Sequence, residues 1–255
     1  MGKFIVFCMK RLSFVAILAV ILVTILSVSS CKVTETLNLK SSITEDSTLS
    51  GKSHIDLSVS DYFISVIEDL SNWDESGNTD PILEVAVDEF VQNLEASDSA
   101  SSVKFIKTGK NIYMGDFNYS DFSSLVIDLS KNPDCSLVTA TEKDGKTHVQ
   151  IHIGMDNYDE LTEIVPFLAN PNFEVYGPLY NNDLTEENYL EMMGFILGEE
   201  CPDEILNSKV TIQVVAPKEI TSHNGTLKNA KTVVFSFPLI DFLLLHEPID
   251  FELEY

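Results

Sequence analysis

Apolar and polar side chains alternate along several stretches of the chain, and this period of two predicts β-strands. Residues 33–39 and 54–59 alternate in this way on either side of the polar turn 47–51, which predicts a β-hairpin. A second pair of strands is expected around Asp144-Gly145, a strong hairpin signal. The remaining strands are expected at 103–107, 111–114, 209–215, 232–237 and 249–255.

A helical period appears in other segments. Residues 61–73 and 82–94 place apolar side chains on one face, and Asp80-Pro81 supplies a start signal for the second helix. Thr185 caps a further helix over 186–197. Two shorter helices are expected at 120–129 and 158–168. Residues 170–182 are predicted as a loop, and the apolar segment 239–245 fits either type of element.

Together these elements predict an α+β fold, a mainly antiparallel sheet of hairpins with a helical pair and one further helix packed on it. Antiparallel pairing is expected because the strands come in adjacent hairpins and not as βαβ units. Residues 31–255 are long enough to form one domain with its own core.

The N-terminal 30 residues have the composition of a secretory signal peptide. Lys3, Lys10 and Arg11 precede the almost wholly apolar run 14–28. Val28-Ser29-Ser30-Cys31 follows and resembles the bacterial lipobox. The resemblance implies cleavage before Cys31 and a diacylglycerol on its thiol, often with acylation of the new amine. A transmembrane anchor is the alternative, but the run has about 15 residues and a spanning helix needs ~20.

The chain is strongly acidic, with 40 Asp+Glu against 16 Lys+Arg. The first 30 residues hold three basic and no acidic residues, so their removal changes the net charge from −24 to −27. Such a surface repels nucleic acid, so DNA or RNA partners are not expected.

After Cys31, the cysteines are Cys135 and Cys201. An exported protein enters a compartment where disulfides persist, so one interpretation pairs these two residues. The other interpretation is two separate buried thiols. No Cys or His residues show the spacing of a zinc site, and no metal is expected.

Aromatic and methionine residues gather around 176–197. Tyr176, Tyr180, Tyr189, Met192 and Met193 cluster there together with Phe195, and Leu243 belongs to the apolar segment 239–245. Packing in the core is one interpretation. The other is an apolar groove between helix and sheet that holds an acyl chain or a partner helix, a role for which methionine is well suited.

Signals for catalysis or metal binding are weak. His148 and His152 share one face of a strand but lie about 13 Å apart, too far to chelate one metal together. Residues 156–160 are the nearest approach to a calcium loop, yet they lack its alternating ligands. No nucleophile elbow, zinc-protease or nucleotide-binding motif is present, so the chain is not expected to be an enzyme.

The order of elements is similar to that of the LppM-like domain family of bacterial lipoproteins and of spirochaete-type lipoproteins. The similar features are the lipobox, the hairpin ending at 55–59, the helices after it, the strand 210–215 with Ala216-Pro217, and Asn224-Gly225 before 233–237. The sequence departs from the family at its first turn, 45–48, which lacks glycine, and it reaches Tyr255 without a C-terminal membrane helix. The resemblance implies a cell-envelope protein that binds lipid or glycolipid, and it brings no catalytic residues.

The sequence therefore predicts a lipid-anchored protein of the cell membrane or outer membrane, facing the periplasm or the exterior. We expect a non-enzymatic binding or scaffolding module for lipid or glycolipid, with an envelope protein as a further partner and no cofactor besides the acyl chains on Cys31. One alternative is a surface-exposed, adhesin-like protein. The other is an envelope hydrolase that depends on His54 or His246.

Overall fold

The computed structural model describes residues 31–40, 49–71, 80–165, 168 and 171–255. Three predictions fall outside this part of the chain: the signal peptide and lipobox residues 1–30, the turn at 45–48, and residues 74–79 of the polar loop 74–80 that the sequence predicts between the first two helices.

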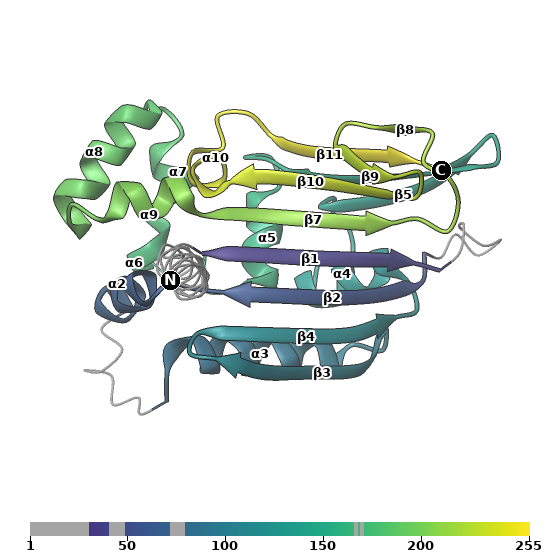
Figure 1. Cartoon of the computed structure of the whole chain (residues 1–255), viewed down its shortest axis with the longest axis horizontal. Coiled ribbons are helices and arrows are strands. Elements are labelled where there is room, and N and C mark those ends of the chain that lie inside the picture. The colour runs from purple at the N-terminus through teal and green to yellow at the C-terminus, as the bar shows by residue number, and fades with distance from the viewer. Residues whose placement is uncertain (1–30, 41–48, 72–79, 166–167, 169–170) are drawn as a thin grey trace, which may run out of the picture.

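Seven strands form the larger sheet, in the order β3-β4-β2-β1-β7-β10-β9 (Figure 1). The predicted hairpin β1–β2 is confirmed, and the strands predicted at 103–107 and 111–114 form a second hairpin, β3–β4, with longer strands than expected. β1 and β7 run parallel, whereas the other described pairs of this sheet run antiparallel. The strands are β1 (Lys32–Leu39), β2 (Gly51–Ser58), β3 (Ala100–Gly109), β4 (Ile112–Tyr119), β7 (Lys209–Val215), β9 (Thr226–Asn229) and β10 (Thr232–Pro238).

A smaller sheet has the order β5-β6-β11-β8. Asp144 and Gly145, between β5 and β6, have φ angles of 55° and 76°. Two consecutive positive φ angles are what a two-residue hairpin turn of type I′ requires, so the Asp-Gly prediction is confirmed. The strands are β5 (Val138–Lys143), β6 (Lys146–Ile153), β8 (Ser222–His223) and β11 (Ile249–Glu254).

Two helices begin at capping residues whose side chains accept a backbone hydrogen bond. Ser60 Oγ accepts a hydrogen bond from the Phe63 N–H at 3.2 Å, and Thr185 Oγ1 accepts one from Asn188 at 3.3 Å. The helices are α2 (Asp61–Ser71), α3 (Ile82–Ala96), α4 (Phe122–Ser130), α5 (Tyr158–Ile164), α6 (Pro171–Glu174), α7 (Pro178–Asn181), α8 (Glu186–Leu197), α9 (Cys201–Asn207) and α10 (Leu239–Leu244).

The predictions for 170–182 and 158–168 need correction. The predicted loop 170–182 contains α6 and α7, which both start with proline, a residue whose fixed φ suits the first helical turn. Helix α9 was not predicted, and the apolar segment 239–245 forms α10. Helix α5 ends earlier than expected, because Val165 precedes a proline and adopts a non-helical φ of −121°.

One hydrophobic cluster contains residues of both sheets. Leu37 and Val214 of the larger sheet, Val149 and Leu253 of the smaller sheet, and Leu94 of α3 are all buried in it. Phe235 of β10 stacks on Phe251 of β11 with ring centroids 4.6 Å apart. The fold is therefore α+β, with two mainly antiparallel sheets sharing a core where one sheet was expected.

A second cluster joins α2, α8, α9 and α10 at the end of the larger sheet where β1 begins (Figure 1). Its buried members include Tyr189, Met193, Cys201 and Ile205. We call α2 and α6–α10 the helical cap. None of the described helices is both long and apolar enough to cross a membrane.

Candidate functional site

An apolar cavity of about 310 Å³ lies between α3 and the strands β1–β4. We call it the α3 cavity. Glu89 and Asn93 are the charged or amide side chains in its lining. Its volume falls at the lower end of the range of small-ligand pockets, about 300–1,000 Å³. The lining includes Val33, Ile55 and Phe105 from the strands and Ala86, Val87 and Phe90 from α3.

The α3 cavity is shaped by one small residue, Gly115, and two large ones, Phe90 and Phe105. Gly115 on β4 faces Phe105 on β3, and a Cβ atom at Gly115 would lie only 2.2 Å from Phe105 Cε1. The Phe105 ring therefore lies across Gly115 and meets Phe90 of α3 edge-on, with centroids 5.8 Å apart. The two rings form one wall of the α3 cavity.

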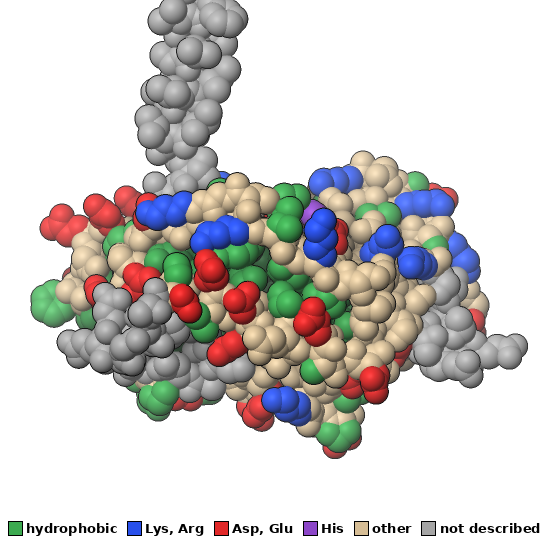
Figure 2. Space-filling model, turned by 90° about the horizontal axis from the view of Figure 1, so that it is seen from below, with side chains coloured by type: hydrophobic (Ala, Val, Ile, Leu, Met, Phe, Trp, Pro, Cys, Tyr) green, Lys and Arg blue, Asp and Glu red, His purple; other side chains and the backbone are tan. Residues whose placement is uncertain are grey.

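Acidic side chains lie close to this apolar surface. Seen from below, hydrophobic side chains appear near the middle of the molecule with Asp and Glu beside them (Figure 2). Helix α3 bears Glu84, Asp88, Glu89 and Glu95. Glu84 pairs with Lys107 Nζ at 2.8 Å. A negatively charged ligand group beside α3 would meet repulsion from the other carboxylates.

A carboxyl group lies on the same face of these strands as the lining residues Val33 and Ile55. Val33, Glu35 and Leu37 are every second residue of β1 and therefore share one face. The Glu35 side chain thus lies on the core side of the sheet. Ser53 Oγ donates a hydrogen bond to Glu35 Oε1 at 2.5 Å. Burial raises the pKa of Glu35 to about 8, against the opposing effect of the Ser53 hydrogen bond. Glu35 is therefore largely protonated at neutral pH.

Four of the six residues predicted to form a groove between helix and sheet line a cavity among helices instead. Tyr176, Tyr189, Met193 and Leu243 line a cavity of about 160 Å³ within the helical cap, between α2, α8 and α10. Two predicted residues do not line it: Tyr180 is 62% exposed, and Met192 packs against the cap cluster. Phe195, from the same stretch, is 91% exposed.

Most of that aromatic stretch packs in the cap core. Tyr189 is fully buried, and its hydroxyl donates to the Tyr176 carbonyl oxygen at 2.6 Å. Burial raises the pKa of Tyr189 well above its usual value. The cap cavity is about half the size of the α3 cavity, so the α3 cavity is the better candidate for a ligand.

Cys31 is half-buried where the chain enters the larger sheet. Its backbone N–H donates to Ser208 Oγ at 2.9 Å, and its carbonyl oxygen accepts from the Lys209 N–H at 3.0 Å. Burial raises the pKa of the Cys31 thiol to about 11, against a backbone hydrogen bond from Ser60. Lipidation of Cys31 stays a prediction.

Of the two interpretations of Cys135 and Cys201, the disulfide is absent from the structure, in which both thiols are free. Cys201 is buried in the cap cluster beside Tyr62, whereas Cys135 follows α4 and interacts with Ser130 and Glu160. Burial raises the pKa of both thiols. The interpretation as two separate thiols is the one that fits.

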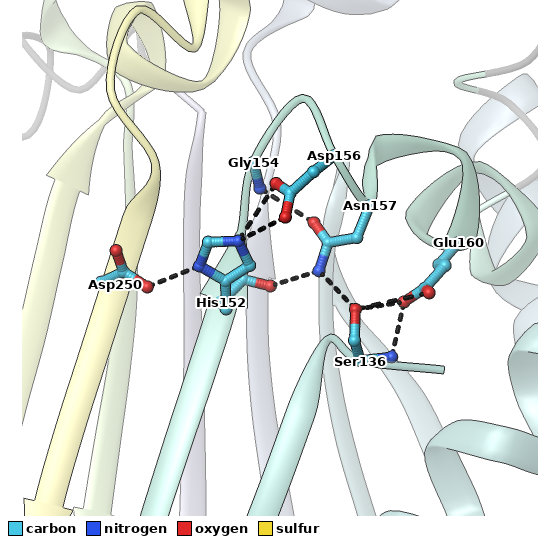
Figure 3. Close-up of polar contacts among 7 residues, drawn as sticks. All are labelled: Ser136, His152, Gly154, Asp156, Asn157, Glu160 and Asp250. Carbon is cyan, nitrogen blue, oxygen red and sulfur yellow. Dashed lines mark hydrogen bonds and ion pairs between the residues drawn. The ribbon is translucent and has the colours of Figure 1, made fainter. Parts of the chain in front are cut away.

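Figure 3 shows the polar cluster that contains part of the suggested calcium loop. His152 lies between two carboxylates, with Nδ1 2.6 Å from Asp250 Oδ1 and Nε2 3.1 Å from Asp156 Oδ1. Asn157 Nδ2 donates to the His152 carbonyl oxygen, and its Oδ1 accepts from the Gly154 N–H. The hydrogen bond to Asp250 is the main reason that the pKa of His152 is raised.

These contacts hold the loop after β6 between α5 and β11, so their role is structural. Glu160 Oε2 accepts from the Ser136 N–H at 2.7 Å, so two acidic residues of the suggested calcium loop are engaged with protein groups. His148 pairs separately with Glu254. Within the described part of the chain, no three His, Cys, Asp or Glu side chains are arranged to hold a metal ion.

The hydrolase alternative depends on His54 or His246, and the groups that these histidines contact are carboxylates and a backbone carbonyl oxygen. His54 lies 2.9 Å from Asp116 Oδ1 and 3.4 Å from Asp56 Oδ2. His246 Nε2 donates to the Leu184 carbonyl oxygen at 2.7 Å. A cleft of about 430 Å³ borders His246, but no Ser, Thr or Cys lines it among the described residues. Ser, Thr and Cys are side chains that a neighbouring histidine base activates as nucleophiles.

The sequence did not reveal the α3 cavity. Its lining residues appear in the sequence as the apolar face of a helix and the apolar faces of strands, the same pattern that a filled core produces. The available signal was Gly115 in a strand, because a strand glycine often marks a close approach.

The sequence matches no protein-family model and no curated protein. Among solved structures, the chain is similar to the NMR structure of the folded domain of LppM from Mycobacterium tuberculosis, at 11% sequence identity. The similarity covers 89% of each chain with a TM-score of 0.39. A likeness of this degree says nothing about what this chain binds.

Proposed function

We propose that the chain is a lipid-anchored envelope protein that holds an acyl chain of a neutral lipid or glycolipid in the α3 cavity, without catalysing a reaction. The observation that carries the proposal is the cavity itself, about 310 Å³ and lined mainly by apolar side chains between α3 and the sheet. The signal-like N-terminus and Cys31 support the anchor.

The chemistry of the cavity favours an acyl chain. Each methylene moved from water into such a site contributes about 0.8 kcal/mol, and the strand and α3 side chains offer no charged partner for a polar ligand except Glu89. The carboxylates of α3 disfavour a phosphate or carboxylate head group at the cavity mouth. A sugar or another uncharged head group avoids this repulsion.

The test is native mass spectrometry of residues 31–255, produced without the preceding segment, followed by titration with a fluorescent fatty alcohol. Ala86 lies exposed on α3 and lines the cavity, so Ala86→Phe blocks the mouth without disturbing the core. Ala96→Phe makes the same change at an exposed position of the same helix outside the lining, and is the matched control.

We expect a lipid-sized mass on the wild-type protein and on Ala96→Phe, and its loss in Ala86→Phe. The fluorescent alcohol should bind at least about tenfold more weakly to Ala86→Phe, a difference of about 1.4 kcal/mol. A wild-type domain that retains no lipid and does not bind the alcohol would refute the proposed function. Equal binding by all three proteins would place the ligand outside the α3 cavity.

A further inference from the structure

Exposed apolar side chains are concentrated on the helical cap. Eleven large hydrophobic residues of the described chain are exposed, and six of them lie between residues 175 and 206. Phe195 on α8 is the most exposed, at 91%, and its neighbour Ile196 is 48% exposed. The other four are Val175, Leu179, Tyr180 and Leu206. Phe195 and Ile196 adjoin on one helix, and adjoining exposed apolar side chains mark contact surfaces more often than scattered single residues do.

The cap lies at the end of the domain where Cys31 enters. Cys31 is hydrogen-bonded to Ser208, the residue that follows α9, and Tyr62 Oη of α2 donates to the Leu197 carbonyl oxygen of α8. β1 begins at the same end of the larger sheet as α8 and α9 (Figure 1). The anchor residue and the exposed apolar side chains therefore belong to one end of the molecule.

The strand β1 begins at Lys32, directly after Cys31. A residue in extended conformation spans at most ~3.6 Å, so an anchor on Cys31 leaves no linker that could hold the domain away from the bilayer. Whatever surrounds Cys31 must then lie at the level of the lipid head groups. The apolar side chains of the cap meet this surface at a high effective concentration.

Charge restricts the kind of lipid surface. Glu199, Glu200 and Asp203 follow α8 directly and lie close to Phe195 in the sequence. They repel anionic head groups and leave zwitterionic lipids as the compatible partner. Aromatic and branched apolar side chains suit the boundary between head groups and acyl chains.

We propose that the helical cap docks onto a zwitterionic bilayer surface, with Phe195 and Ile196 of α8 at the head-group boundary. This inference rests on the proposed lipid anchor at Cys31. It fixes the orientation of the domain, with the cap against the membrane and the opposite ends of the strands directed away from it.

The experiment uses the full chain, expressed in a bacterium that processes lipoproteins and reconstituted in phosphatidylcholine vesicles. In a Cys135→Ser background, an environment-sensitive fluorophore is attached to Phe195→Cys or, as the matched control, to Leu227→Cys. Leu227 on β9 is also an exposed apolar residue, at 44%, but lies outside the cap. Spin-labelled phosphatidylcholine and aqueous iodide quench each label, and the intact mass of the same sample reports the acyl chains on Cys31.

We expect the label at residue 195 to be quenched several-fold more by the spin-labelled lipid than the label at 227, with the reverse order for iodide. Acylated Cys31 with both labels equally accessible to iodide overturns the docked orientation and leaves the anchor intact. A mass without acyl chains refutes the anchor itself, independently of the quenching pattern.

Discussion

Replacing Glu35 by Gln tests whether a protonated carboxyl lies inside the larger sheet. Glu35 accepts a hydrogen bond from Ser53, which is only 2% exposed, and the pKa of the carboxyl is raised by burial from 4.5 to about 8. Glutamine keeps the acceptor oxygen for Ser53 and has nearly the same shape. The substitution therefore removes the ionisation and little else.

The pKa difference sets how stability depends on pH. Between pH 4.5 and about 8 the unfolded chain has lost this proton while the folded domain keeps it. The unfolded state binds fewer protons there, so the free energy of unfolding falls as the pH rises through this window. A shift of about 3 pKa units corresponds to about 3–5 kcal/mol at 1.36 kcal/mol per unit. That is a large part of the 5–15 kcal/mol that stabilises a typical domain.

The assay is urea unfolding of the wild-type domain and Glu35→Gln at several pH values between 5 and 9. We expect nearly equal free energies of unfolding at pH 5, and an advantage of about 3–5 kcal/mol for Glu35→Gln at pH 9. Glu95→Gln, at an exposed position on α3, is the control and should follow the wild type. Parallel curves for the wild type and Glu35→Gln would show that the carboxyl ionises as freely in the folded domain as in the unfolded chain.

Three further substitutions test other parts of the structure. His152→Gln should lower stability most below pH 6.5, because Asp250 is the main cause of the raised pKa of His152. The stability that His152 contributes is lost as the pH rises through its pKa in the folded protein. Thermal unfolding at pH 5.5 and 8.5 measures this, and an effect independent of pH would contradict it. Tyr189→Phe leaves the partly buried Tyr176 carbonyl oxygen without its donor and should cost about 1–3 kcal/mol in urea unfolding. No loss would mean that this hydrogen bond is not formed. Gly115→Val should push the Phe105 ring into the α3 cavity and weaken binding of the fluorescent alcohol. Unchanged binding would show that this ring does not shape the cavity.

Local sequence patterns predicted most of the elements. The alternation at 33–39 and 54–59 and the Asp144-Gly145 turn produced hairpins at the expected positions, because one face of each strand must be buried. Caps such as Thr185 fixed helix starts for a local reason, since the side chain bonds a nearby backbone N–H. Short helices such as α6 and α9 lack a long apolar stripe and therefore escaped prediction.

These local patterns did not predict the tertiary features of the fold. The parallel pairing of β1 with β7 joins residues 177 positions apart, and no local signal records it. Tyr176 and Met193 were correctly placed together, but the same composition also marked Tyr180, which is exposed. The α3 cavity depends on how completely facing side chains fill a space, which one sequence does not display.

The central position of β1 has a consequence for the order in which the chain folds. β2 follows β1 closely and pairs with one edge of it, whereas β7 pairs with the other edge. During synthesis the chain emerges N-terminus first, so β1 keeps one open edge until residues 209–215 arrive. Open strand edges are templates for association with other chains. The late strand β7 is thus the element that protects the earliest one, and a chain that stopped short of Lys209 would present an aggregation-prone edge beside Cys31.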